Sequence, residues 1–159
     1  MLILMSKASQ QENELQSTLI SLLGLVPVVL VTTIVFILIA RLDPGSPKPT
    51  TRNGEIFMAS IWGGLSLLFL YIGLSGLIRG ETVVGWGNTL YQVRTTLTGA
   101  GAFVASSGTA IGGLLLVVAS LMSFYPHLGP ETYQLAAVVG WLVSTFLSWL
   151  IGFIIKSLE

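Results

Sequence analysis

The polar side chains that lie deepest within an apolar stretch of this chain are hydroxyls, gathered at Ser106, Ser107 and Thr109. Hydroxyls can line a hydrated path or bind a polar ligand inside a membrane without carrying a charge. They can equally donate a hydrogen bond to a carbonyl one turn back in a helix, or to a neighbouring helix, for about 0.6 kcal/mol each. We favour structural hydrogen bonding, and a pore or ligand role for these three residues is the alternative.

Catalysis needs groups that the four longest apolar stretches lack. A nucleophile needs a base within reach, and the interiors of these stretches contain no Asp, Glu, Lys, Arg or His. Proton and sodium pumps usually place a carboxylate at membrane depth, and the sequence has none there. We therefore expect that the protein is not an enzyme, and the sequence does not support an ion pump.

The single histidine, His127, is the one side chain that could ligate a metal or a pigment. It lies in a short segment rich in proline and glycine, with Glu131 four residues further on. Metal sites need several convergent ligands, and the chain has no second histidine and no cysteine. We expect no metal site, no intrinsic cofactor, and no pigment or metal at His127. Bound lipid is expected instead.

The composition suits a chain that is dissolved in hydrocarbon. Of its 159 residues, 53% are hydrophobic and only 9% are charged, and the mean hydropathy is +0.86. Soluble proteins carry roughly 25% charged residues, so this chain has too few charges to cover a surface in water. Its basic and acidic residues are equal in number and scattered, which leaves no basic patch for a phosphate backbone. We predict a membrane protein that does not bind nucleic acid.

Four apolar stretches are long enough to cross a bilayer as helices. A spanning helix needs about 20 mostly apolar residues, because the hydrocarbon layer is roughly 30 Å thick and each residue rises about 1.5 Å. Such stretches occur at about residues 19–40, 56–78, 99–125 and 133–155. They are too long for strands and do not alternate in polarity, which excludes a barrel. We predict an all-α fold, with one membrane domain over residues 1–159 that contains four transmembrane helices.

Three connections join the predicted helices. Residues 41–55 are rich in proline and glycine, which predicts an exposed connector without regular structure. Residues 79–98 contain two short apolar runs around a Gly/Asn turn. They could form a small hairpin, or a short interfacial helix anchored by Trp86 and Tyr91. Residues 126–132 form a tight turn, which makes the last two helices antiparallel neighbours in a helical hairpin.

The first predicted helix is bulky and β-branched almost all round, and we expect it to face lipid. Its flank is not basic and no small-residue cleavage site follows it, so we interpret it as a retained span rather than a signal peptide. An even number of spans places both termini on the same side of the membrane. Four basic residues on that side against three on the other do not determine which side it is.

Small residues recur every four positions in each of the last two predicted helices. The first set is Gly101, Ala105, Thr109 and Gly113, and the second set is Gly140, Ser144, Ser148 and Gly152. A four-residue spacing places each set on one face of its helix. In lipid, helices associate by close backbone approach, which small residues permit. The simplest inference is that the two helices pack on each other along these faces, and packing against another subunit is the alternative.

These features favour a non-catalytic membrane subunit that packs into and stabilises a larger membrane protein complex. Three observations motivate this hypothesis: spans without ionisable residues, long small-residue faces, and soluble segments too short to be domains. Respiratory and photosynthetic complexes contain many such chains, which is an analogy of class only. The expected partners are other membrane protein subunits and lipids. The alternative is a small homo-oligomeric channel or transporter with a hydroxyl-lined path at residues 106–109.

Overall fold

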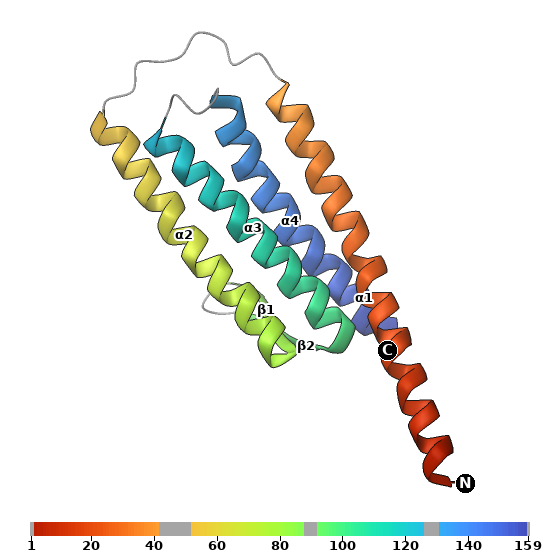
Figure 1. The fold of residues 1–159 in the computed structure, drawn as a ribbon. Coiled ribbons are helices and arrows are strands. Elements are labelled where there is room, and N and C mark those ends of the chain that lie inside the picture. The colour runs from red at the N-terminus through yellow and green to blue at the C-terminus, as the bar shows by residue number, and fades with distance from the viewer. Residues whose placement is uncertain (1, 42–51, 88–91, 126–130, 159) are drawn as a thin grey trace.

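The computed structural model describes residues 2–41, 52–87, 92–125 and 131–158 of the chain. Four long helices run up and down beside one another, namely α1 (Leu2–Ala40), α2 (Arg52–Arg79), α3 (Gly99–Phe124) and α4 (Glu131–Leu158) (Figure 1). Each contains a stretch that is long and apolar enough to cross a membrane. The predicted all-α fold with four candidate spans is therefore confirmed.

The helix boundaries follow the predicted spans to within a few residues, except that α1 begins far upstream. Residues 52–55, predicted as part of the irregular connector, instead form the first turn of α2. The hydropathy pattern starts α1 at residue 19, whereas its helical backbone starts at Leu2. The segment before residue 19 contains Gln, Glu and Lys, which are good helix formers that hydropathy does not count. With 39 residues and a rise of about 1.5 Å per residue, α1 is about 58 Å long and projects beyond the other helices (Figure 1).

The helix α3 lies at the centre of the bundle. It packs closely against both α2 and α4, while α1 packs mainly on α4 and less on α3. In the most apolar stretch of α3, 61% of the residues are buried, compared with 17% in α1 and 17% in α2. The outer helices α1 and α2 lie on opposite sides of this centre and have little contact with each other (Figure 1).

The exposed side chains of α1 agree with a helix that faces lipid. Large apolar side chains are exposed over most of the described part of this helix. Val28 and Thr32 are among the few residues of this part that are buried. Val28 packs with Val104 of α3 and Ile155 of α4, where the three helices meet. The helix α1 is therefore attached along one side and leaves the rest of its surface outside the bundle.

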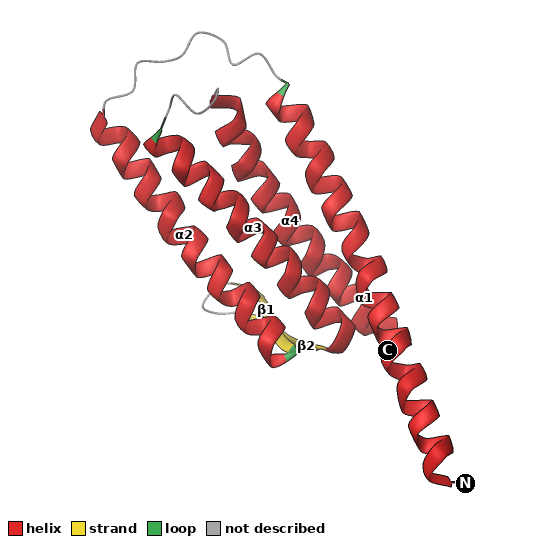
Figure 2. Ribbon diagram, viewed as in Figure 1, coloured by secondary structure: helices red, strands yellow, loops and turns green. Residues whose placement is uncertain are grey.

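A short β-hairpin connects α2 to α3 at one end of the bundle (Figure 2). Its strands, β1 (Glu81–Gly87) and β2 (Gln92–Thr98), pair antiparallel over their whole length. Thr82 and Val84 of β1 and Leu97 of β2 are buried on one face, because alternate residues of a strand point to the same side. Of the two alternatives for the connection between α2 and α3, the structure has the hairpin.

Two glycines turn the chain into and out of this hairpin. Gly80 (φ 67°) follows the end of α2, and Gly99 (φ 57°) opens α3. Both adopt a left-handed backbone conformation that residues with a Cβ atom disfavour. The two corners of the hairpin therefore depend on glycine.

The hairpin is held against the helices by apolar packing and by one hydrogen bond. Val84 and Leu97 cluster with Ala102 of α3. Lys156, near the end of α4, donates a hydrogen bond from Nζ to the Thr96 carbonyl of β2 at 2.5 Å. The hairpin therefore packs against the N-terminal part of α3 and lies beside the C-terminal end of α4.

Some sequence predictions fall on residues outside the described part of the chain. These are residues 42–51 of the first connector, Tyr91 between the strands, and residues 126–130 of the turn between α3 and α4, which include His127. The side chain of Trp86 is likewise outside the described part. The expectations for these residues stay predictions.

Candidate functional site

Two glycines bring the backbones of α3 and α4 into direct contact. A Cβ atom built on Gly101 would lie 2.8 Å from the Gly152 carbonyl oxygen, and one built on Gly152 would lie 2.8 Å from the Gly101 carbonyl oxygen. Neither position has room for a side chain. Ala105, one turn further along α3, is fully buried beside this contact. Close backbone approach of this kind is how helices associate in lipid.

Two serines of α4 continue the contact toward the middle of the bundle. The Ser144 hydroxyl donates a hydrogen bond to the Gly108 carbonyl of α3 at 2.8 Å. The Ser148 hydroxyl donates to the Thr145 carbonyl of its own helix at 2.9 Å and lies 3.4 Å from the Ala105 carbonyl of α3. A Cβ atom on Gly108 would overlap the Ser148 side chain. Both serines are fully buried, so hydrogen bonds supplement van der Waals contact between the two helices.

The far ends of the two small-residue sets turn toward other helices. Gly113 of α3 meets α2, where a Cβ atom would lie 2.9 Å from the Leu70 backbone nitrogen. Gly140 of α4 lies near both Leu115 of α3 and Thr32 of α1. A step of four residues overshoots a full turn of an α-helix by about 40°, so three steps rotate the face by about 120°. The single face expected for the α3 set is therefore corrected at Gly113, whereas Gly140 still lies nearest to α3, at its border with α1.

Two glycines outside the four-residue pattern take part in the contact between α3 and α4. They are Gly108, described above, and Gly112. A Cβ atom built on Gly112 would lie 2.7 Å from the Thr145 hydroxyl oxygen. Together with Gly101 and Ala105, they follow steps of four, three and four residues. That alternation keeps to one face of a helix, as it does in helical bundles in general. The spacing is visible in the sequence and identifies the packing face better than a strict four-residue repeat.

The opposite side of α3 packs just as closely on α2, a contact that was not predicted from the sequence. A Cβ atom on Gly73 of α2 would lie 2.6 Å from the Ala110 backbone nitrogen of α3. A Cβ atom on Gly76, one turn further, would overlap the Ser106 side chain. The helix α3 thus uses small residues toward two neighbours at once, which explains why glycine and alanine occur around so much of it.

The hydroxyl cluster lies inside the chain and not on its outer surface. Ser106 is 1% exposed, Ser107 is 9% exposed and Thr109 is 2% exposed. Thr109 donates to the Ala105 carbonyl one turn back at 2.7 Å and accepts a hydrogen bond from the Trp149 indole nitrogen of α4 at 3.1 Å. The Ser106 hydroxyl has no hydrogen-bond partner among the described residues. Thr109 therefore connects α3 to α4, and Ser106 is packed against α2.

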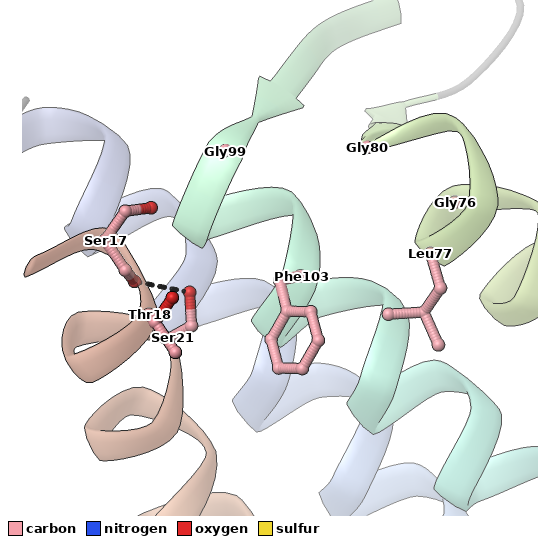
Figure 3. Close-up of a pocket in the computed structure, with 8 residues that line it drawn as sticks. All are labelled: Ser17, Thr18, Ser21, Gly76, Leu77, Gly80, Gly99 and Phe103. Atoms are coloured by element: carbon pink, nitrogen blue, oxygen red, sulfur yellow. Dashed lines mark hydrogen bonds between the residues drawn. The ribbon is translucent and has the colours of Figure 1, made fainter. Parts of the chain in front are cut away.

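A pocket of about 240 Å³ opens between α1 and α2 near the hairpin (Figure 3). Its lining consists of Ser17, Thr18, Ser21, Gly76, Leu77 and Phe103, together with the two corner glycines of the hairpin. In Figure 3 the Phe103 ring lies between the serines of α1 and Leu77 of α2. These residues are far apart in the sequence and carry no motif, so only the fold brings them together.

Neither a cluster of metal ligands in the described residues nor a similarity to known proteins indicates a function. Within the described ranges, no group of three or more His, Cys, Asp or Glu side chains could hold a metal ion. No family model matches the chain, and comparison with curated proteins and with solved structures gives no match. The geometry of the chain itself is therefore what indicates its function.

Proposed function

We propose that this chain is a non-catalytic subunit that packs into and stabilises a larger membrane protein complex. The use of its surfaces supports this proposal. The small residues of α3 and α4 are engaged in contacts within the chain and form a tightly packed centre. The outer surfaces of α1 and α2 consist largely of exposed apolar side chains. Such a chain offers a rigid apolar surface, and its spans carry no Asp, Glu, Lys, Arg or His in their interiors.

The length of α1 is the observation that carries the proposal. Crossing the hydrocarbon layer takes about 20 residues, and this helix has 39. The hydropathy pattern starts the span at about residue 19, and the residues before it continue the helix, which projects beyond the other helices (Figure 1). Helix propensity favours this extension, and packing on a surface outside this chain would stabilise it further, as it does for most helices in proteins. In the proposed complex, that surface belongs to another membrane protein subunit.

The alternative, a homo-oligomeric channel or transporter with a hydroxyl-lined path, has less support. A pore shared between copies is lined by side chains on the outer surface of each copy. Ser106 and Thr109 lie instead between the helices of one chain, against Gly76 of α2 and hydrogen-bonded to Trp149 of α4. Opening a path to them would separate the contacts that hold α3 in place.

The mass of the native particle tests the proposal directly. The chain is extracted gently in detergent from its source membrane, and every subunit of the particle is identified. We expect a particle that contains several different proteins in fixed ratio, and the identity of these proteins would indicate the process. A symmetric particle of this chain alone would overturn the proposal. Solute flux into liposomes that contain only this chain, lost in folded Ser106→Leu or Thr109→Leu variants, would then support the channel.

A further inference from the structure

We propose that the pocket between α1 and α2 binds one membrane glycerolipid, whose glycerol region lies at the α1 hydroxyls and whose acyl chain follows α3. The pocket faces the bilayer from within a single chain. This inference therefore does not depend on whether the chain assembles with other subunits.

The depth of the pocket matches the part of a lipid that changes from polar to apolar. The pocket residues of α1, which lie between Ser17 and Ser21, are at the place where the hydropathy pattern starts the span, at about residue 19. On α2 the lining ends at Gly80, immediately after the helix, and on α3 it begins at Gly99, the first helical residue. With 26 residues, α3 is about 39 Å long, against roughly 30 Å of hydrocarbon. Its first residues therefore lie near headgroup level, and Phe103 lies where the hydrocarbon begins.

Hydroxyl groups from α1 provide the polar side of the pocket. The Ser21 hydroxyl donates to the Ser17 carbonyl at 2.8 Å, which leaves the Ser21 oxygen available as an acceptor. Ser17 is exposed at the pocket and carries a hydroxyl that can donate and accept. None of the lining side chains is ionisable. The chemistry therefore fits the ester and hydroxyl oxygens that glycerolipids share, and it does not select a headgroup charge.

An apolar strip of α3 continues from the pocket along the bundle. Phe103 is 40% exposed, and Leu114, Val118 and Leu121 are also exposed. Their spacing of eleven, four and three residues places all four within about 60° of one another around the helix. These side chains lie on one side of a helix that is otherwise the most buried of the four, with a gap of about 16 Å between Phe103 and Leu114 where Ser107 is buried.

The two outer helices border this strip on either side. Val104, next to Phe103, packs against Gly24 of α1, and Ala110 packs against Gly73 of α2. Since α1 and α2 have little contact with each other, the strip between them is open to the bilayer. An acyl chain lying on the strip would have protein on three sides, whereas a lipid on the outside of α1 or α2 has protein on one.

The size of the pocket favours a lipid over a partner helix. Its volume of about 240 Å³ is below the roughly 300–1,000 Å³ of sites that enclose a whole ligand. It therefore encloses one part of an occupant, and the remainder lies along the open strip. A glycerolipid has this division between a compact polar region and a long apolar chain. A spanning helix would instead need a uniform surface along its length.

Photolabelling of the full chain in liposomes tests the site. The liposomes consist of phosphatidylcholine with a trace of phosphatidylcholine that carries a photoreactive group near the start of one acyl chain. Labelled peptides are mapped by mass spectrometry after illumination. We expect the label to concentrate at residues 17–21 and 99–103. The substitution Ser17→Trp fills the pocket from an exposed position and should lower this labelling at least about tenfold, which corresponds to ~1.4 kcal/mol of binding free energy.

A matched substitution outside the pocket separates a site effect from a general one. Ser60 is an exposed serine of α2 whose hydroxyl bonds the Ile56 carbonyl within its own helix, and Ser60→Trp should leave the pocket labelling unchanged. Leu77→Trp fills the pocket from α2 and serves if Ser17→Trp does not fold. Label spread evenly over lipid-facing residues such as Leu67, or unchanged labelling in a folded pocket-filling variant, would overturn the proposal. The map of the unmodified chain decides the question even if neither variant folds.

Discussion

Gly101 and Gly152 face each other so closely that the carbonyl oxygen of each lies 2.8 Å from the place where a Cβ atom of the other would stand. The obstacle on both sides is backbone, which cannot rotate away as the end of a long side chain can. A larger residue at either position must therefore move a whole helix. The buried Ala105 and Ser148 lie one turn further on, so this pair sets the separation of α3 and α4 near the hairpin.

Alanine at Gly101 should destabilise the bundle, although alanine is the better helix former. We expect Gly101→Ala to lower the free energy of unfolding by about 1–3 kcal/mol, the usual effect of overpacking a close contact. Thermal unfolding in detergent measures it. Gly64 of α2 is the control, because it is exposed and a Cβ atom there would have no neighbour within 4 Å. Gly64→Ala should be neutral or stabilising by up to about 1 kcal/mol. Equal losses in the two variants would contradict the prediction.

The hydrogen bond from Ser144 should contribute to packing, whereas a similar bond within one helix should not. Ser144 donates to the Gly108 carbonyl of another helix at 2.8 Å, and Ser60 donates to the Ile56 carbonyl of its own helix at 2.8 Å. We expect Ser144→Ala to lower the free energy of unfolding by about 0.6 kcal/mol. Ser60→Ala should change it by much less, because the same local bond forms in an isolated helix. If Ser60→Ala proved the more harmful, interhelical bonding would not be the cause.

The bond between Trp149 and Thr109 can be isolated with a double-mutant cycle. The indole nitrogen donates to the threonine hydroxyl at 3.1 Å. Trp149→Phe removes the donor, Thr109→Val removes the acceptor, and the double variant corrects for changes in packing. We expect a coupling free energy of about 0.6 kcal/mol, typical of a hydrogen bond between membrane helices. Chemical denaturation in mixed micelles measures the four proteins. Strictly additive effects would show that the bond adds nothing to stability.

Removing residues 2–12 should leave the bundle intact while releasing the chain from its proposed complex. These residues precede the apolar stretch of α1 and lie in the part of the helix that projects beyond the other helices (Figure 1). We expect unchanged thermal unfolding of the isolated chain and a native particle that lacks it. A variant in which Gly and Ser replace the same residues controls for length. A stable particle that keeps the shortened chain would show that the extension does not anchor it.

The sequence predicts the spans well and their neighbours only in part. A span is a local property, because twenty apolar residues without charge suit hydrocarbon wherever they occur. The partner of each small residue depends on the whole arrangement. Gly108, Gly112 and Gly113 lie within six residues of α3, yet the first two face α4 and the third faces α2. With glycine on several sides of a central helix, spacing alone does not assign each one to a neighbour.

The pocket shows the same limit more strongly. Ser17 lies well inside α1 and Phe103 lies near the start of α3, far apart along the chain, and neither stands in a recognisable motif. Their proximity follows from α1 lying against α3 and α4. No local pattern reports that arrangement. The start of α1 illustrates the opposite case, since helix propensity in the polar residues before residue 19 is a local signal that hydropathy overlooks.

The separation of α1 from α2 has a consequence for how the protein is made. During synthesis these two helices enter the bilayer before α3 and α4, yet they have little contact with each other. The main neighbour of α1 is α4, which follows the other three helices along the chain. The helix α1 must therefore wait in the lipid until α4 has been synthesised, while α2 and α3 can already pair. The four-helix bundle closes only when α1 meets α4, so a chain that stops before residue 131 would leave α1 without its principal contact.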